Sequence, residues 1–141
     1  MTKPVIGTAP CSEAGCMGAV GVPVWLWTQP WVAQSATASA GGISVTVTAK
    51  VGGVTWSMGD GKRVVCGTPG TPFDVSMGVV PSPDCGYRYE RTSAKQPGQK
   101  YAVTATASWI VVWSGAYTAN TTVTTSTATS LAIGEYQVLT Q

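Results

Sequence analysis

Two long stretches of the sequence place apolar residues at every second position, and this period of two restricts the chain to a fold built from β-strands. The alternation runs without a break through residues 43–51, and every odd position from 101 to 113 is apolar. Threonine and valine favour strands, whereas leucine, a strong helix former, occurs at only three positions. We therefore predict an all-β protein in which each long strand buries one face.

Segments rich in glycine and proline divide the remaining chain into short pieces that are typical of strands joined by turns. Gly52-Gly53 is predicted to turn the first alternating stretch into a separate strand over residues 54–58. The spacing favours an immunoglobulin-like, antiparallel β-sandwich of about seven strands. We assign residues 1–31 to a leader rich in Gly, Pro and Trp that packs on the sandwich, and residues 32–141 to the sandwich domain.

The four cysteines are predicted to form two disulfides, Cys11–Cys16 and Cys66–Cys85. A metal site is the alternative, but the chain has no histidine, and its cysteines lack the C-x-x-C spacing usual in zinc sites. Cys66 and Cys85 flank a long segment rich in Gly and Pro, so their bridge would close a surface loop. Cys11 and Cys16 would close a small loop in the leader.

Paired cysteines favour an oxidising compartment, so we predict a protein that is secreted or associated with the outside of the cell envelope. No apolar stretch reaches 18 residues, and a transmembrane segment is therefore not expected. No signal peptide follows Met1, which we interpret as the start of a trimmed chain.

The composition argues against most catalytic classes. The absence of histidine excludes Ser-His and Cys-His nucleophilic sites, and the six carboxylates show no spacing that predicts a glycosidase pair. Charged residues make up 10% of the chain and the net charge is +2, which disfavours binding to nucleic acid. We predict that the protein is not an enzyme and has no cofactor or metal.

Two separated motifs resemble the signatures of the PKD domain family. Residues 54–61, VTWSMGDG, are similar to the family pattern V-x-W-x-F-G-D-G, with Met58 in place of phenylalanine. Residues 87–89 and 98–106 are similar to the second signature, H-x-Y followed by G-x-Y-x-V-T-x-T, with Tyr87 in place of histidine. The resemblance covers about residues 36–133. It implies an immunoglobulin-like sandwich that serves as a passive extracellular module for contact with proteins or carbohydrates.

The paired Cys66 and Cys85, together with the leading Trp-Leu-Trp segment, are also similar to a group of secreted actinobacterial PKD-like proteins of unassigned role. Within the first motif, Gly59-Asp60-Gly61 is predicted to be a tight turn. Asp60 is expected to accept backbone N–H bonds there, with calcium ligation as the alternative.

Trp25 and Trp27 have two interpretations. With Trp31 they form a platform that stacks on sugar rings, or they are buried over the apolar end of the 101–113 strand. We favour burial, because that strand is apolar on both faces from Trp109 onward, as a covered strand requires.

Arg88 and Arg91 belong to a basic stretch that also holds Lys95 and Lys100. A solvated turn is the simpler interpretation, and contact with an anionic envelope polymer is the alternative.

Two functions remain open from the sequence. The first is a non-catalytic extracellular module that contacts another protein or a cell-wall glycan. The alternative is a structural subunit that self-associates by strand addition at the cell surface. The oligomeric state separates the two.

Overall fold

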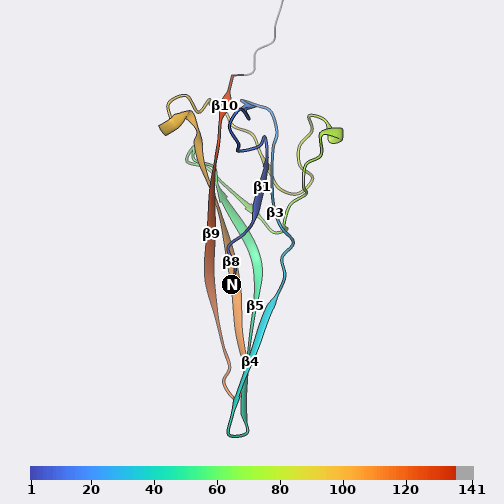
Figure 1. Cartoon of the computed structure of the whole chain (residues 1–141), viewed down its shortest axis with the longest axis vertical. Coiled ribbons are helices and arrows are strands. Elements are labelled where there is room, and N and C mark those ends of the chain that lie inside the picture. Colours follow the sequence, from blue (N-terminus) through green and yellow to red (C-terminus); the bar gives the residue numbers. More distant parts are fainter. Residues whose placement is uncertain (136–141) are drawn as a thin grey trace, which may run out of the picture.

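The computed structural model describes residues 1–135 and has an all-β, mainly antiparallel, sandwich-like fold (Figure 1). Seven of its ten strands have four or more residues. Residues 136–141, the end of the range assigned to the sandwich, lie outside the described part. Within residues 1–135, no helix has the length and apolar character needed to cross a bilayer. The strands are β1 (Ile6–Ala9), β2 (Gly18–Ala19), β3 (Val24–Thr28), β4 (Gln34–Ala40), β5 (Ile43–Ser57), β6 (Arg63–Cys66), β7 (Gly86–Tyr87), β8 (Tyr101–Gly115), β9 (Ala119–Leu131) and β10 (Ile133–Gly134).

The larger sheet has the order β4-β5-β8-β9, and β6 pairs with the last part of β5. Its long strands are those with the period-two pattern, so one face carries the apolar side chains. In Figure 1 these four strands continue beyond the rest of the molecule and taper into a narrow end, which we call the stem, residues 35–48 and 111–123.

The prediction of a turn at Gly52-Gly53 is wrong. β5 is a single strand of 15 residues, and its register against β8 shifts between Val51 and Gly53. A β-bulge absorbs the additional residue and leaves the hydrogen bonds with β8 on either side intact. The hairpin turn lies instead at Gly41-Gly42, where both glycines have positive φ, 57° and 79°, as a two-residue turn between β4 and β5 requires.

The smaller sheet has the order β1-β3-β7, so the predicted leader supplies two of its three strands. Val24 and Leu26 of β3 are fully buried and belong to the core cluster, together with Trp56 of β5. Thr28, which has the same parity, lines a cavity against the larger sheet. One face of β3 therefore packs on the larger sheet and closes the core.

The end of β8 is covered on one face only, which corrects the expectation of cover on both faces. Trp109 and Val111 lie on the inner face, where Trp109 lines a cavity with residues 2–5 and Val111 lines a hollow with Met1, and each is 4% exposed. Ile110 and Val112, which alternate with them, are 40% and 41% exposed. The end of β8 therefore has apolar side chains on both faces, although only one of these faces is covered.

Three tyrosines form a cluster beside the β5–β6 turn. The rings of Tyr89 and Tyr101 stack with their centres 4.4 Å apart, and Tyr87 meets Tyr89 edge-on at 5.0 Å. The Tyr89 hydroxyl donates to the carbonyl oxygen of Met58 at 2.8 Å. Burial, with the nearby Asp60 carboxylate as a further cause, raises the pKa of all three hydroxyls above the ordinary tyrosine value.

Alkaline conditions are therefore expected to unfold the protein. The unfolded chain loses these protons near pH 10, whereas the folded state retains them, so the free energy of unfolding falls as pH rises above about 10. Each tyrosine protonated only in the folded state contributes a slope of about 1.4 kcal/mol per pH unit. Urea unfolding between pH 8 and 11 measures the slope. Tyr89→Phe should reduce it, and Tyr117→Phe, at an exposed position, is the control for removal of a hydroxyl as such.

Candidate binding cleft

In the Gly59-Asp60-Gly61 turn, both carboxylate oxygens of Asp60 accept hydrogen bonds. Gly59 and Gly61 have φ of 83° and 91°, values that residues other than glycine rarely adopt. Asp60 Oδ1 accepts from the backbone N–H of Lys62 at 3.0 Å, and Oδ2 accepts from the Tyr87 hydroxyl. The chain's own donors therefore occupy this carboxylate, and the bond to Tyr87 links the turn to β7.

Asp60→Ala is expected to lower stability by about 0.5–2 kcal/mol, because a backbone N–H and a hydroxyl both lose their acceptor. Thermal unfolding in calcium and in chelator measures this loss and any calcium dependence. We expect identical melting temperatures in both solutions for the wild type. A rise with calcium that Asp60→Ala abolishes would show that this carboxylate is a calcium ligand.

Both predicted disulfides are present, Cys11–Cys16 and Cys66–Cys85, and no cysteine is free. The second bridge closes the 67–84 loop. Within that loop Asp84 accepts from the Thr68 and Thr71 hydroxyls at 2.8 and 3.0 Å. Among residues 1–135, no three His, Cys, Asp or Glu side chains gather as a metal site would require.

Trp25 is buried, but the predicted location of both leader tryptophans is wrong. They alternate with the inward residues of β3 and so lie on its outer face. Trp25 is covered by the 67–84 loop: its Nε1 donates to the Val80 carbonyl at 2.7 Å, and its ring meets Phe73 edge-on at 5.1 Å. The half-buried Trp27 ring lies against Gly7, where any Cβ would overlap it.

The basic stretch does not form an uninterrupted positive patch. Arg88 Nη1 donates to the Gly21 carbonyl at 3.4 Å. Arg91 lines a shallow hollow that also contains the carboxylates Glu90 and Glu135. Glu90 in turn pairs with Lys62 at 3.1 Å, with both side chains largely exposed. This surface is electrically mixed and is a weak site for an anionic polymer.

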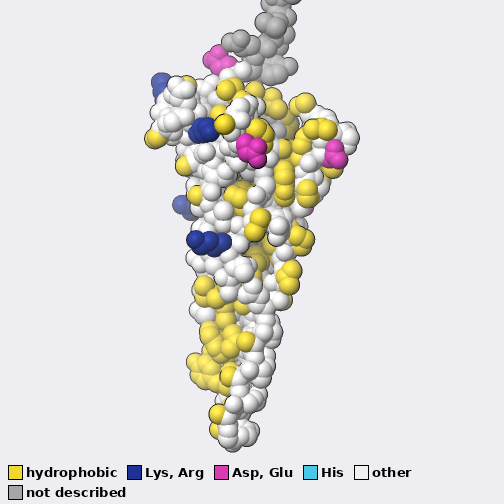
Figure 2. All heavy atoms as spheres, in the orientation of Figure 1, with side chains coloured by type: hydrophobic (Ala, Val, Ile, Leu, Met, Phe, Trp, Pro, Cys, Tyr) yellow, Lys and Arg dark blue, Asp and Glu magenta, His cyan; other side chains and the backbone are white. Residues whose placement is uncertain are grey.

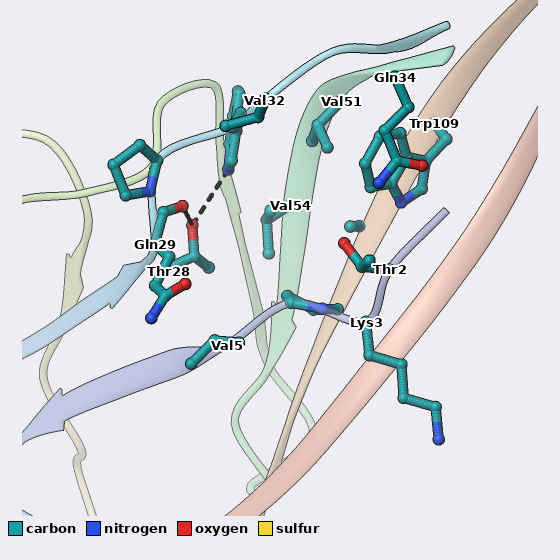
Figure 3. Close-up of a pocket in the computed structure, with 14 residues that line it drawn as sticks. Thr2, Lys3, Val5, Thr28, Gln29, Val32, Gln34, Val51, Val54 and Trp109 are labelled. Carbon is teal, nitrogen blue, oxygen red and sulfur yellow. Dashed lines mark hydrogen bonds between the residues drawn. The ribbon is translucent and has the colours of Figure 1, made fainter. Parts of the chain in front are cut away.

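A cleft opens between the two sheets, where the chain segments 2–5 and 28–34 cross the inner face of β5 and β8 (Figure 3). Its volume is about 190 Å³. Its floor is apolar and consists of Val51, Val54, Ala107 and Trp109, and its walls carry Trp31 and two glutamine side chains. We call this site the indole cleft.

Hydrogen bonds hold both indoles of the indole cleft in place. Trp31 Nε1 donates to Thr28 Oγ1 at 3.1 Å, and Trp109 Nε1 donates to Thr125 Oγ1 at 3.0 Å. The Thr125 hydroxyl in turn donates to the Thr2 carbonyl at 3.0 Å, which ties the N-terminal segment to β9. Both indoles are therefore positioned before any ligand arrives. Trp109 is buried and forms part of the floor, whereas the half-buried ring of Trp31 is the aromatic surface left for binding.

The lining suits an uncharged ligand. Gln29 and Gln34 supply amide donors and acceptors, and the indoles and valines supply apolar surface. Among the residues that line the cleft, Lys3 alone is charged, and in Figure 3 its side chain points away from the cavity. The lining residues include no carboxylate or thiol, and the amides and hydroxyls among them can form hydrogen bonds with such a ligand.

Of the three leader tryptophans considered as a platform, only Trp31 lines this cleft. Gln29, Gln34 and the β5 valines were not predicted as site residues. Arg88 and Arg91 also lie elsewhere. The polar, proline-containing segment that follows β3 could have indicated Gln29 and Gln34. Such a segment cannot continue the strand, so it leaves the sheet next to the core and can form the wall of a cleft.

The two motifs that resemble PKD domains lie side by side in the larger sheet. Residues 54–61 form the end of β5 and its turn, residues 98–106 lead into β8, and Trp56 pairs with Ala105 in the register between them. No family model, curated protein or solved structure matches the chain. The PKD resemblance therefore stays a prediction from the two motifs.

Proposed function

We propose that the protein is a non-catalytic, PKD-like module that acts outside the cytoplasm and contacts a cell-envelope component through the indole cleft. An uncharged glycan is the first candidate occupant. A partner protein that inserts an uncharged side chain is the second. The lining of the cleft by two indoles and two amides is the observation that carries this proposal.

The extracytoplasmic location draws support from the two disulfides, which persist in oxidising compartments. The motif resemblance to a family of passive extracellular modules points the same way. Both arguments concern where the protein acts, whereas the cleft concerns what it holds.

A sugar ring suits the cleft because it combines apolar C–H faces with hydroxyl groups along its edge. The faces would stack on Trp31, above the buried Trp109 of the floor, and the hydroxyls would bond to Gln29 and Gln34. The volume of about 190 Å³ is below the range typical of drug-sized ligands, so a single ring or chain end is the expected occupant.

Titration with soluble oligomers of N-acetylglucosamine and of glucose, followed by tryptophan fluorescence and calorimetry, tests the proposal. Gln29→Ala and Gln34→Ala should each weaken binding about two- to tenfold, because a neutral hydrogen bond contributes about 0.5–1.5 kcal/mol. Gln96→Ala is the matched control, since its side chain makes no capping bond and lies outside the cleft.

Failure of every oligomer and of isolated cell walls to bind would reject the glycan. Binding that persists unchanged in the double variant Gln29→Ala/Gln34→Ala would reject the cleft as the site. Retention of an envelope protein by the wild type, lost in that double variant, would make the second candidate occupant correct.

A further inference from the structure

β9 is a long sheet edge without the features that usually prevent pairing. Its 13 residues, Ala119–Leu131, include no charged residue, proline or glycine. It pairs with β8 along its whole length and ends the order of the larger sheet, and Figure 1 shows its other side facing outward. A row of backbone N–H and C=O groups is therefore available for a further strand.

The edges formed by β6 and β1 do carry such features. β6 begins at Arg63 and follows Lys62, and β1 lies between Pro4 and the Pro10 that follows it. Lysine, arginine and proline at or near an edge oppose strand addition. The contrast within one molecule marks β9 as an edge open to a partner.

The charge distribution indicates what that partner is. The chain has no charged residue from 101 to 134, and in Figure 2 the coloured charged side chains lie on the wide part of this face and not on its narrow end. A charged strand would gain no ion pair at β9 and would lose hydration there. An uncharged strand of similar length is the suitable occupant, and the chain itself supplies one.

We propose that β9 pairs antiparallel with β9 of a second copy about a two-fold axis at Thr125, the central residue of the strand. An antiparallel edge is complementary to itself, so one surface serves both partners and the assembly closes as a dimer. In this register Thr124 lies opposite Ser126 of the second copy, and Val123 opposite its Thr127. Hydroxyl pairs of this kind stabilise antiparallel sheets, and no like charges meet.

The length of β9 favours this edge over the opposite one. β4 also lacks charges, proline and glycine, but has 7 residues against 13. A 13-residue ladder spans about 44 Å at 3.4 Å per residue and offers nearly twice as many backbone bonds. The dimer leaves the indole cleft on the inner face of each copy and does not depend on the proposed glycan contact.

Light scattering during size-exclusion chromatography of the full chain, over a range of loading concentrations, measures the assembly. We expect a dimer for the wild type. Thr124→Lys/Ser126→Lys places lysines opposite each other on both sides of the axis and should weaken the dimer about tenfold or more. Mixing this variant with Thr124→Glu/Ser126→Glu should restore pairing as a heterodimer, because opposite charges then face each other.

Thr37→Lys/Ser39→Lys is the matched control on exposed positions of β4 and should leave the dimer intact. Circular dichroism of each variant confirms that its sheet is retained. A wild type that stays monomeric at all concentrations overturns the proposal. So does a dimer that the β4 lysines dissociate and the β9 lysines do not, or growth into open filaments.

Discussion

A chain that lacks residues 1–30 is expected to aggregate or to remain unfolded. The deletion removes β1 and β3, two of the three strands of the smaller sheet. Val24, Trp25 and Leu26 are at most 4% exposed, and burial of each such side chain contributes about 1.5–3 kcal/mol. The apolar face of the larger sheet would also lose its cover. Together these losses approach the whole stability of an ordinary domain, about 5–15 kcal/mol.

Point variants on the two faces of β3 show how much of its contribution to stability comes from the side chains that pack in the core. Leu26→Ala, on the inward face, should cost about 2–5 kcal/mol in chemical denaturation. Trp27→Ala, on the outer face, is the control and should cost about 1 kcal/mol. A truncated protein that stays monomeric and equally stable, but no longer binds an envelope component, would instead make the leader a recognition segment.

The strands that the sequence predicts best are those whose two faces differ most in hydropathy. In β5 and β8 threonine or serine alternates with valine, alanine and tryptophan, and the buried parity is evident. The contrast is weak in β4, where alanine alternates with serine and threonine. Gly52-Gly53 was misassigned because glycine serves both turns and bulges, and the choice depends on whether β8 continues alongside.

The smaller sheet could not be predicted in the same way. β1, β3 and β7 are short, and Val24 of β3 pairs with Tyr87 across more than 60 positions of sequence. A four-residue apolar run such as Val24–Trp27 does not show which side chains face the core, because the outer side of the strand is partly covered too. The 67–84 loop supplies that cover, and no local pattern indicates where a loop folds back.

The indole cleft was beyond local sequence patterns for a related reason. Its walls come from the segments 2–5 and 28–34, and its floor from residues 51–54 and 107–109. Only the packing of one sheet on the other brings these pieces together. What the sequence does predict is the chemistry available to such a site, because a chain with no histidine and few charges leaves amides, hydroxyls and indoles as its binding groups.

Removing the Cys66–Cys85 bridge with Cys66→Ala/Cys85→Ala is expected to cost about 3 kcal/mol. The two cysteines are 19 positions apart, and the chain-entropy relation gives about this value for a closed loop of that size. The loop they close also covers Trp25 through Val80 and Phe73. Loosening it should therefore expose that indole, shift tryptophan emission to longer wavelength in the folded protein, and lower the midpoint of denaturant unfolding.

Cys11→Ala/Cys16→Ala is the matched control for the loss of a disulfide as such. Its loop joins cysteines five positions apart, for which the same relation gives about 2 kcal/mol, and the Val80 and Phe73 contacts of Trp25 lie outside it. Emission from the folded protein should therefore stay at the wild-type wavelength. An unshifted emission in Cys66→Ala/Cys85→Ala would show that the 67–84 loop covers Trp25 without help from its bridge. An unchanged unfolding midpoint in Cys66→Ala/Cys85→Ala would show that the loop is held by its contacts alone.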